Sequence, residues 1–285
     1  MLQFLTYLFI AIYTATVIGI ILVVILGNRN PLKTIPWVVV LIFAPVVGLV
    51  FYFFFGQDLR RKRIISRRTY KRLMVYALPA HVRRSDAPVP AACQSLSTLL
   101  TNTSQAVSFY GSRLTHYGDG ASKMIALLEE IEKARDHIHI LYYIFCDDET
   151  GARLQQALIR KAKEGVKVRV LYDDVGCNGV KKEFFQQMRD AGAEVHALLH
   201  VRFPMLTDRV NYRNHRKIVV IDGRIGFIGG MNIADRYVRG TQWGTWRDTH
   251  FRIEGSGAAG LQASFLSDWS ATTKQQIAAA EYYPP

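Results

Sequence analysis

Hydrophobic residues form two long runs in the first part of the chain and shorter, periodic patterns after it. Residues 1–27 and 37–56 contain no charged side chain. Because a helix rises about 1.5 Å per residue, about 20 apolar residues span a hydrocarbon core of roughly 30 Å. Glycine, asparagines and prolines in the linking residues 27–36 favour a tight reversal. The pattern therefore predicts a transmembrane hairpin, with spans at about 2–26 and 37–55.

The first apolar stretch has two other interpretations, a cleaved signal peptide or a helix buried in a protein core. A signal peptide has a basic n-region, a shorter apolar run and a small-residue cleavage site. This stretch shows none of these features. Two membrane spans remain the expectation.

A dense basic cluster follows the second span and sets the expected orientation. Lysine and arginine outnumber acids there by eight to one, which supplies +7 (eight minus one) of the net charge of +13. The positive-inside rule then places the C-terminal domain and the N-terminus on the cytoplasmic side of the cell membrane. Such a cluster can attract anionic lipid headgroups. A signal for membrane topology alone explains it equally well, and a nucleic-acid patch explains it less well. Its members are Arg60, Arg61, Lys62, Arg63, Arg67, Arg68, Lys71 and Arg72, with Asp58 as the single acid.

Short strand and helix patterns alternate from about residue 108 onward. Apolar positions at helical spacing predict helices, and near-continuous apolar runs predict buried strands. Alternation with short connections predicts an α/β fold, a sheet flanked by helices. The expected helices cover about 121–134, 151–164 and 181–192, and the expected strands cover about 137–145, 166–174 and 194–199.

This organisation predicts three segments. Residues 1–56 form the transmembrane hairpin, and residues 57–107 form a basic juxtamembrane segment and linker without a strand pattern. Residues 108–285 form the α/β half-domain. Its segment 258–269 has apolar side chains four residues apart, which predicts a helix packed on the sheet.

A predicted hairpin marks the candidate catalytic segment. The β-branched run 218–221 predicts a strand, Asp222-Gly223 predicts a type I′ turn, and residues 224–229 predict the returning strand. His215 and Lys217 stand two residues apart just before it. If the strand already begins there, both side chains share one face of the sheet.

Three side chains near this hairpin suit a phosphodiester. The imidazole of His215 can attack phosphorus or transfer a proton, while Lys217 and Asn232 can hold the non-bridging oxygens. Asn232 follows the pair Gly229-Gly230, whose backbone can approach a ligand closely. A single histidine beside a hairpin is more often a surface or core residue, and only the joint spacing favours catalysis.

The same segment resembles the signature of the phospholipase D superfamily. His215, Lys217 and Asp222 match the pattern HxKxxxxD, and Gly229-Gly230-x-Asn232 matches G(G/S)xN. The wider sequence resembles bacterial cardiolipin synthases in particular. The resemblance extends over IHILYYIFCDDETG, GVKVRVLYDDVG, GFIGGMNIADRY and WRDTHFRIEG.

This resemblance implies a role for each matched residue. His215 would belong to a pair of histidines, one forming a covalent phosphohistidine and the other serving as acid and base. Lys217 and Asn232 would bind the phosphate, and Asp222 would be structural. Asp248 would orient the histidine, a sensible role because a carboxylate on the far ring nitrogen fixes the tautomer.

The sequence departs from the family pattern in two places. Leu141 stands where relatives often carry a polar residue, so it receives no catalytic role. The family's enzymes contain the motif twice, whereas this sequence contains it once. Since one histidine cannot serve as both nucleophile and leaving-group acid, we expect a truncated, split or shortened version. Activity would then need a second motif-bearing half, either a separate chain or a homodimeric copy.

Other candidate sites carry less weight. Asp147-Asp148 and Asp173-Asp174 stand at strand ends, where acids gather anyway, and the resembled chemistry needs neither metal nor cofactor. His137 and His139 alternate with apolar residues, which predicts core or edge packing. GDGASK at 118–123 lacks the spacing of a phosphate loop. The three cysteines show no metal-ligand spacing and fit free thiols.

The expected function is phosphatidyl transfer by a multi-pass membrane protein. Two phosphatidylglycerol molecules would give cardiolipin and glycerol through a phosphohistidine. The expected partners are phosphatidylglycerol, other anionic phospholipids and the membrane, without nucleic acid. Two alternatives stay open: a homodimeric single-motif phosphodiesterase that cleaves nucleic acid, and a non-catalytic membrane protein that binds anionic lipid.

Overall fold

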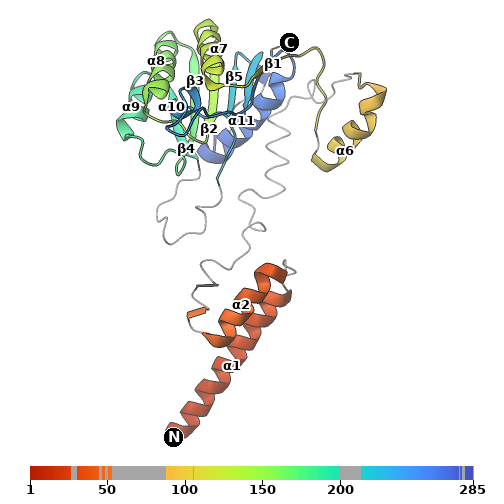
Figure 1. Ribbon diagram of the computed structural model, residues 1–285, viewed down its shortest axis with the longest axis vertical. Coiled ribbons are helices and arrows are strands. Elements are labelled where there is room, and N and C mark those ends of the chain that lie inside the picture. The colour runs from red at the N-terminus through yellow and green to blue at the C-terminus, as the bar shows by residue number, and fades with distance from the viewer. Residues whose placement is uncertain are drawn as a thin grey trace. The chain divides into compact units, whose positions relative to one another are not determined.

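The structure, a computed structural model, describes residues 1–26, 31–44, 47–48, 51–52, 88–104, 106–198, 213–275, 277 and 280–284. These residues divide into two units. The N-terminal unit contains α1 (Leu2–Leu26) and α2 (Pro31–Phe43), which lie side by side (Figure 1). Counting only residues whose placement is described, no helix is both long and apolar enough to cross a membrane. The two spans stay a prediction, and the basic cluster at 58–72 lies outside the described residues.

The second unit, called the α/β unit below, contains the described elements from residue 91 onward. Its helical elements are η3 (Ala91–Cys93), α6 (Gln94–Ser104), α7 (Gly120–Lys133), α8 (Glu149–Lys163), α9 (Lys182–Asp190), α10 (Asp235–Val238), α11 (Ala258–Thr273) and η6 (Ala280–Tyr282). Its strands are β1 (Arg113–Tyr117), β2 (His137–Tyr142), β3 (Lys167–Asp173), β4 (Glu194–Leu198), β5 (Ile218–Ile221), β6 (Ile225–Gly229) and β7 (His250–Glu254).

The strands of the α/β unit form one mixed sheet. Their order is β1-β7-β6-β5-β2-β3-β4. β2, β3 and β4 run parallel, with α8 and α9 as the crossover helices between them, and the other neighbouring pairs are antiparallel. The expectation of a sheet flanked by helices is therefore confirmed for this unit. Strands β1 and β7, which complete the antiparallel side, were not predicted.

Helices cover both faces of the sheet (Figure 1). On one face α7 and α8 bury Leu127 and Leu158 in a core that includes Ile140 of β2. On the other face α11 packs Phe265 into a second core that includes Leu141. Successive strand side chains point to opposite faces, so adjacent residues of β2 are buried in different cores. This two-sided burial explains the near-continuous apolar character of the strand.

The predicted elements between residues 120 and 198 agree closely with the structure. The largest difference concerns the strand expected at 137–145, because β2 ends at Tyr142. After Tyr142 the chain leaves the ladder, and Phe145 forms an isolated bridge with Ile233. The predicted helix at 258–269 is confirmed and runs on to Thr273.

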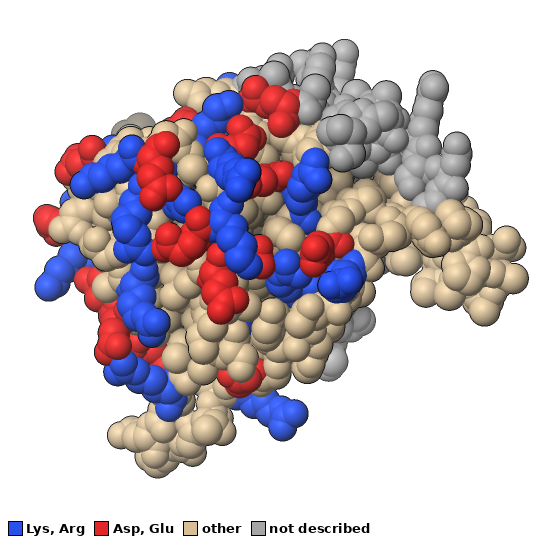
Figure 2. Space-filling model, turned by 90° about the horizontal axis from the view of Figure 1, so that it is seen from above, with Lys and Arg blue, Asp and Glu red and all other residues tan. Residues whose placement is uncertain are grey.

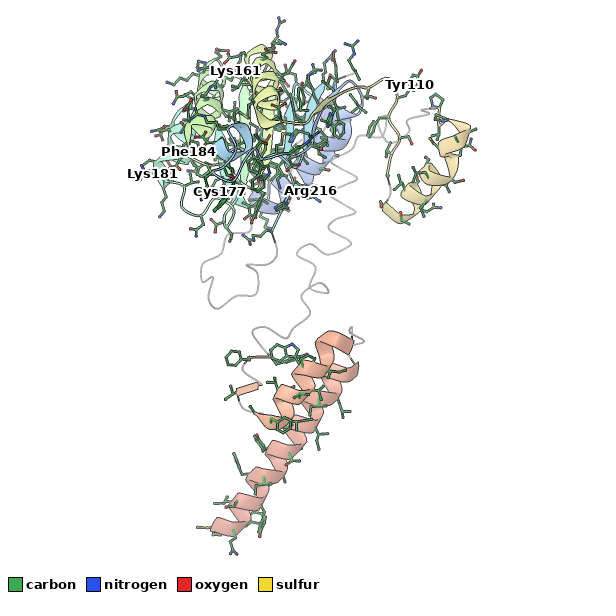
Figure 3. All side chains as sticks on the ribbon, viewed as in Figure 1. Tyr110, Lys161, Cys177, Lys181, Phe184 and Arg216 are labelled. Atoms are coloured by element: carbon green, nitrogen blue, oxygen red, sulfur yellow. The ribbon has the colours of Figure 1, made fainter. Side chains whose placement is uncertain are left out.

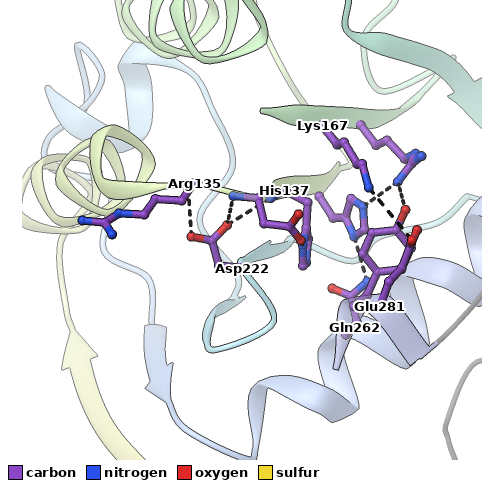
Figure 4. A network of polar contacts seen from close by, with 10 residues as sticks. Arg135, His137, Lys167, Asp222, Gln262 and Glu281 are labelled. Carbon is purple, nitrogen blue, oxygen red and sulfur yellow. Dashed lines mark hydrogen bonds and ion pairs between the residues drawn. The ribbon is translucent and has the colours of Figure 1, made fainter. Parts of the chain in front are cut away.

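The predicted hairpin between β5 and β6 is confirmed. Asp222 and Gly223 both have positive φ angles, 50° and 64°, as a type I′ turn requires. The carboxylate of Asp222 also reaches the start of β2, as Figure 4 shows. It accepts hydrogen bonds of 2.9–3.0 Å from three successive backbone N–H groups, those of Arg135, Asp136 and His137. The turn thereby holds two neighbouring strands in register.

His137 and His139 pack in the core beneath α11, as expected. The ring of His139 stacks on Phe265 with 4.5 Å between centroids, and its Nδ1 lies 2.8 Å from Nε2 of Gln262. Burial lowers the pKa of both imidazoles below the ordinary value. These histidines are therefore neutral packing residues.

Candidate active site

The candidate residues gather where several strands end on the same side of the sheet, called the site end below. The parallel strands β2 and β3 end there, at Tyr142 and Asp173. The antiparallel partners β5 and β7 begin there, at Ile218 and His250, and β6 ends there at Gly229. The carboxyl ends of parallel strands are where open α/β sheets usually bind ligands. Figure 3 shows Arg216 and Cys177 on this lower side of the α/β unit, away from Tyr110.

His215 and Lys217 converge at the site end. The strand begins at Ile218, as its β-branched run predicted, and does not extend back to His215. The two side chains still meet: Lys217 Nζ lies 2.8 Å from His215 Nδ1 and donates to the His215 carbonyl oxygen at 2.6 Å. His215 is exposed, whereas Lys217 is only 2% exposed. A solvent-accessible imidazole thus lies beside a nearly buried ammonium.

Anchored side chains hold the irregular segment before β5 in place. Arg213 forms an ion pair with the buried carboxylate of Asp173, with 3.3 Å between Nη1 and Oδ1. Asn214 Nδ2 and Arg216 Nη1 both donate to Asp268 of α11, at 2.9 and 2.8 Å. These contacts on both sides of His215 explain its fixed position without a strand.

The ring of Tyr143 forms one wall of this pair. Its centroid lies 4.3 Å from that of His215 and 5.3 Å from Lys217 Nζ. The second distance is within the range of a cation–π contact. Tyr143 directly follows β2 and received no role from the sequence.

The charges at the site favour a neutral imidazole beside a protonated amine. Partial burial, and then the Lys217 ammonium, lower the pKa of His215, while Asp173 opposes them. Burial lowers the pKa of Lys217 to about 8, and Asp248 opposes the shift. At neutral pH the imidazole can act as a nucleophile or proton acceptor. The amine keeps the charge that a phosphate oxygen needs.

The Asn232 carboxamide is held at both of its polar atoms. Its Oδ1 accepts from the backbone N–H of Ile144 at 3.0 Å, and its Nδ2 donates to the Tyr237 hydroxyl at 2.7 Å. The side chain is buried. Its orientation is therefore set before any ligand binds.

The glycine pair before Asn232 leaves no room for side chains. A Cβ atom on Gly230 would overlap the carboxylate of Asp248, and one on Gly229 would approach His250 Nδ1 to 2.6 Å. Asp248 itself accepts from the Thr249 N–H at 2.6 Å. Within the described residues, Asp248 and His215 form no hydrogen bond with each other. The carboxylate of Asp248 instead favours the protonated form of Lys217.

Two buried bases lie beside the motif and were missed by the sequence analysis. Lys123 of α7 is fully buried and donates to the Tyr142 hydroxyl at 2.8 Å. His250 is also fully buried, and neither ring nitrogen has a hydrogen-bond partner among the described residues. Burial, and then the charges of Lys123 and Lys217, lower the pKa of His250 to about 2. The sequence did contain a signal for Lys123, because this lysine stands at a position of the predicted helix that faces the apolar residues.

The acidic pairs set aside as metal candidates have structural partners. Asp173 accepts from the backbone N–H groups of Val175 and Gly176, and Asp148 caps α8 by accepting from the Gly151 N–H at 3.0 Å. Across the described part of the chain, no cluster of three or more histidine, cysteine or acidic residues is arranged to hold a metal ion. Asp173 and Asp148 therefore have structural partners within the chain.

The fold and the motif define an α/β domain of the phospholipase D type. The model of the family described as "Cardiolipin synthase, PLD-like domain" matches residues 127–269, half of the sequence, and the chain belongs to this family. A second model, described as "Phospholipase D-nuclease N-terminal", matches residues 14–57.

Curated relatives carry the name cardiolipin synthase. The major cardiolipin synthase ClsA of Bacillus subtilis (strain 168) is 37% identical over 259 residues, covering 88% of this chain and 54% of the relative. A cardiolipin synthase of Geobacillus sp. (strain WCH70) is 38% identical, covering 95% of this chain and 55% of the relative. The chain thus spans about half the length of these relatives.

Solved structures show more distant similarity. Nuc, a phospholipase D family member from Salmonella typhimurium, aligns with a TM-score of 0.44 and 16% identity, over 57% of this chain and 95% of that chain. A phosphatidylserine synthase from Haemophilus influenzae Rd KW20 also gives a TM-score of 0.44 and 16% identity, over 59% of this chain and 41% of that chain. The family assignment rests on the sequence matches.

Proposed function

We propose that this chain supplies one half of the active site of a cardiolipin synthase-type phosphatidyltransferase. The observation that carries the proposal is the 2.8 Å contact between His215 Nδ1 and Lys217 Nζ, an exposed imidazole beside a nearly buried cation. Membership of the cardiolipin synthase family supports the same chemistry. The substrate is phosphatidylglycerol, and the products are cardiolipin and glycerol.

The reaction proceeds in two displacements at phosphorus. A neutral imidazole nitrogen of one histidine attacks the phosphorus of the phosphodiester. The bond from phosphorus to the headgroup glycerol oxygen breaks as a second histidine protonates that oxygen. This step gives a phosphatidyl-histidine and free glycerol. The hydroxyl of a second phosphatidylglycerol then attacks phosphorus, the second histidine takes its proton, and the phosphorus–nitrogen bond breaks. His215 is one member of this pair.

Substrate binding rearranges the contacts of His215. A phosphate oxygen draws the Lys217 ammonium away from Nδ1, because the anion offers a stronger acceptor. Nδ1 can then carry a proton toward the carboxylate of Asp248, which leaves Nε2 free to react. Asn232 holds a second oxygen. Asp222, Gly229 and Gly230 keep the backbone around these groups in place.

The second histidine comes from a second motif-bearing half, either a separate chain or a copy of this chain. The sequence contains one HxKxxxxD motif, and the two displacements need two histidines. This chain alone is therefore weakly active or inactive.

The proposed location is the cell membrane. Spans at about 2–26 and 37–55 anchor the chain, and the half-domain at 108–285 faces the cytoplasm beside its lipid substrate. Support comes from the uncharged sequence of α1, its packing against α2 and the match of residues 14–57 to an N-terminal family model. The basic residues at 60–72 favour the cytoplasmic orientation.

Among the residues that the structure describes, the face of the molecule seen from above (Figure 2) shows no basic patch of the kind that favours a nucleic-acid substrate. On the face of the molecule in Figure 2, lysine and arginine lie interspersed with acidic residues. Among the described residues, Arg160 pairs with Glu132 and Arg252 pairs with Glu130. A nucleic-acid site needs a patch or stripe of one sign.

The proposal predicts cardiolipin formation that depends on His215. The full chain is reconstituted in phosphatidylglycerol vesicles, alone and with a second motif-bearing half, and cardiolipin is measured by mass spectrometry. We expect product only with both halves, and His215→Ala should lower its rate by about 10³-fold or more. The matched control is His116→Ala, which removes an exposed histidine of β1. Unchanged product formation by His215→Ala contradicts the proposal, and so does nuclease activity without lipid turnover.

A further inference from the structure

A loop at the site end exposes two tryptophans. Residues 240–248, called the tryptophan loop, connect α10 to β7. Trp243 is 88% exposed and Trp246 is 45% exposed. Burial of an indole ring is favourable because the ring has a large apolar area and a single polar N–H. A partner that covers the exposed ring would therefore gain free energy of burial.

The loop presents Trp243 on a tightly built turn. The backbones of Thr241 and Gly244 exchange two hydrogen bonds, of 2.8 and 3.0 Å. Gly240 and Gly244 adopt φ angles of 84° and 130°, which favour glycine. Trp243 is thus held outward by the backbone.

The tryptophan loop is connected to the candidate site through Tyr237 and Asp248. The ring of Trp246 lies 5.1 Å from that of Tyr237, whose hydroxyl accepts the hydrogen bond from Asn232. Asp248 ends the same loop. The loop therefore adjoins Asn232 through Tyr237 and carries Asp248 at its end.

Three exposed arginines lie close to the loop in sequence. Arg236, Arg239 and Arg247 are all within seven residues of Trp243, and Asp235 and Asp248, the acids of the same stretch, are only partly exposed. Arg239 is paired with Glu149, and Arg236 lies over the ring of Tyr237. Tryptophan and arginine together are enriched where proteins meet lipid headgroups, since indole rings prefer the interface and cations prefer anionic lipid.

We propose that the tryptophan loop docks the α/β unit onto a bilayer of anionic phospholipid, with Trp243 inserted at the headgroup level. The substrate class in this inference rests on the proposed function, because a lipid that stays in the bilayer must reach a site beside that surface. Docking through this loop places Asn232 and Asp248 close to the headgroups. The loop thereby couples membrane contact to phosphate binding.

Fluorescence quenching in a bilayer tests the insertion without any turnover. The full chain is placed in nanodiscs of phosphatidylglycerol whose acyl chains carry bromine near the headgroup. Its tryptophans are Trp37, Trp243, Trp246 and Trp269. We expect Trp243→Phe to lower the fluorescence intensity lost to bromine per protein molecule, whereas Trp269→Phe, the matched control at a fully buried ring, leaves that loss unchanged. An equal loss of intensity in wild type and Trp243→Phe overturns the proposal.

Kinetics of the reconstituted transfer reaction give a second test. Trp243→Ala should raise the apparent KM for phosphatidylglycerol in vesicles several-fold and leave kcat and the rate on a monomeric short-chain phosphatidylglycerol unchanged. Tyr110→Ala, at a 70% exposed aromatic away from the site end, is the control and should change none of these. A fall in kcat on both substrates overturns the docking role.

The two tests separate this inference from the proposed function. Quenching at Trp243 without cardiolipin formation contradicts the proposed function and supports the docking loop. Burial of Trp243 by a second motif-bearing half in detergent, without lipid, identifies the loop as a protein interface and overturns the inference.

Discussion

Lys217 holds a positive charge where water is nearly excluded. Its ammonium is bound by two atoms of His215, the ring nitrogen and the carbonyl oxygen, and faces the ring of Tyr143. Burying an ammonium without a full counter-charge is costly, and the lowered pKa of about 8 reflects that cost. Under the proposed function, an incoming phosphate oxygen would supply that counter-charge. Bound substrate would then stabilise the Lys217 ammonium more than the free protein does.

Lys123 should make the stability of the α/β unit depend on pH. Burial lowers its pKa from 10.5 to about 7, so between these values the folded protein binds fewer protons than the unfolded chain. The free energy of unfolding then rises with pH across this window, by up to about 1.4 kcal/mol per pH unit from this group. We expect Lys123→Met to reduce the slope, as measured by denaturant unfolding in detergent at pH 7 to 10. An unchanged slope contradicts the burial of an uncharged amine.

A paired variant controls for the hydroxyl that Lys123 contacts. Lys123→Met leaves the buried Tyr142 hydroxyl without its recorded donor, at a cost of about 1–3 kcal/mol. The double variant with Tyr142→Phe should recover most of that cost, because both partners are then apolar. If the two substitutions are simply additive, the hydrogen bond is not the source of the loss.

The sequence predicted the motif residues and missed the buried bases around them. His215, Lys217 and Asn232 follow a spacing that carries chemistry, so the pattern alone indicates them. Lys123 stands at a helical position otherwise occupied by apolar residues, and His250 starts a strand without a clear apolar run. Burial of such residues depends on tertiary packing, which short-range patterns do not contain.

At the scale of elements, the β5–β6 hairpin depends on Asp222. Its carboxylate satisfies three N–H groups at the start of β2, and its backbone holds a φ of 50°. We expect Asp222→Ala to lower the free energy of unfolding by about 2–4 kcal/mol and Asp222→Asn to cost less, because asparagine tolerates this φ and keeps one acceptor. Thermal unfolding in detergent measures both.

An exposed carboxylate provides the control for this prediction. Asp190 accepts one hydrogen bond from Gln186 on the surface of α9, and Asp190→Ala should change stability by no more than about 0.5 kcal/mol. Equal stability of Asp222→Ala and Asp190→Ala would rule out the structural role of the turn carboxylate.

Elements with clean periodicity were predictable, and short mixed strands were not. Helices α7 and α8 begin within two residues of their predicted starts, and their N-caps, Asp119 and Asp148, explain where they begin. Strand β7 has only five residues, and it alternates Phe251 and Ile253 with His250 and Arg252. A period of two over so few residues gives a weak signal. Strand β7 and its partner β1 were therefore missed, whereas the β5–β6 hairpin was predicted.

At the scale of the whole molecule, the site exists because the sheet is buried on both faces. The cores beneath α7–α9 and beneath α11 fix the strands, and the strands bring His215, Asn232 and Asp248 to one end. The sequence indicated the α/β class and the family, since both leave local signals. The proposed second motif-bearing half and the proposed membrane contact would involve surfaces between molecules, so local patterns do not determine them.

The central claim is that His215 and Lys217 bind one phosphodiester, and the titration of the His215 ring tests it most directly. The full chain, labelled at its histidines, is followed by NMR in nanodiscs with and without glycerophosphoglycerol, and His215→Ala assigns the resonance. Binding should raise the pKa of His215, because the anion stabilises the imidazolium, and Lys217→Met should weaken the response. A bound phosphodiester that leaves the pKa of His215 unchanged, or that shifts only other histidines, contradicts the claim.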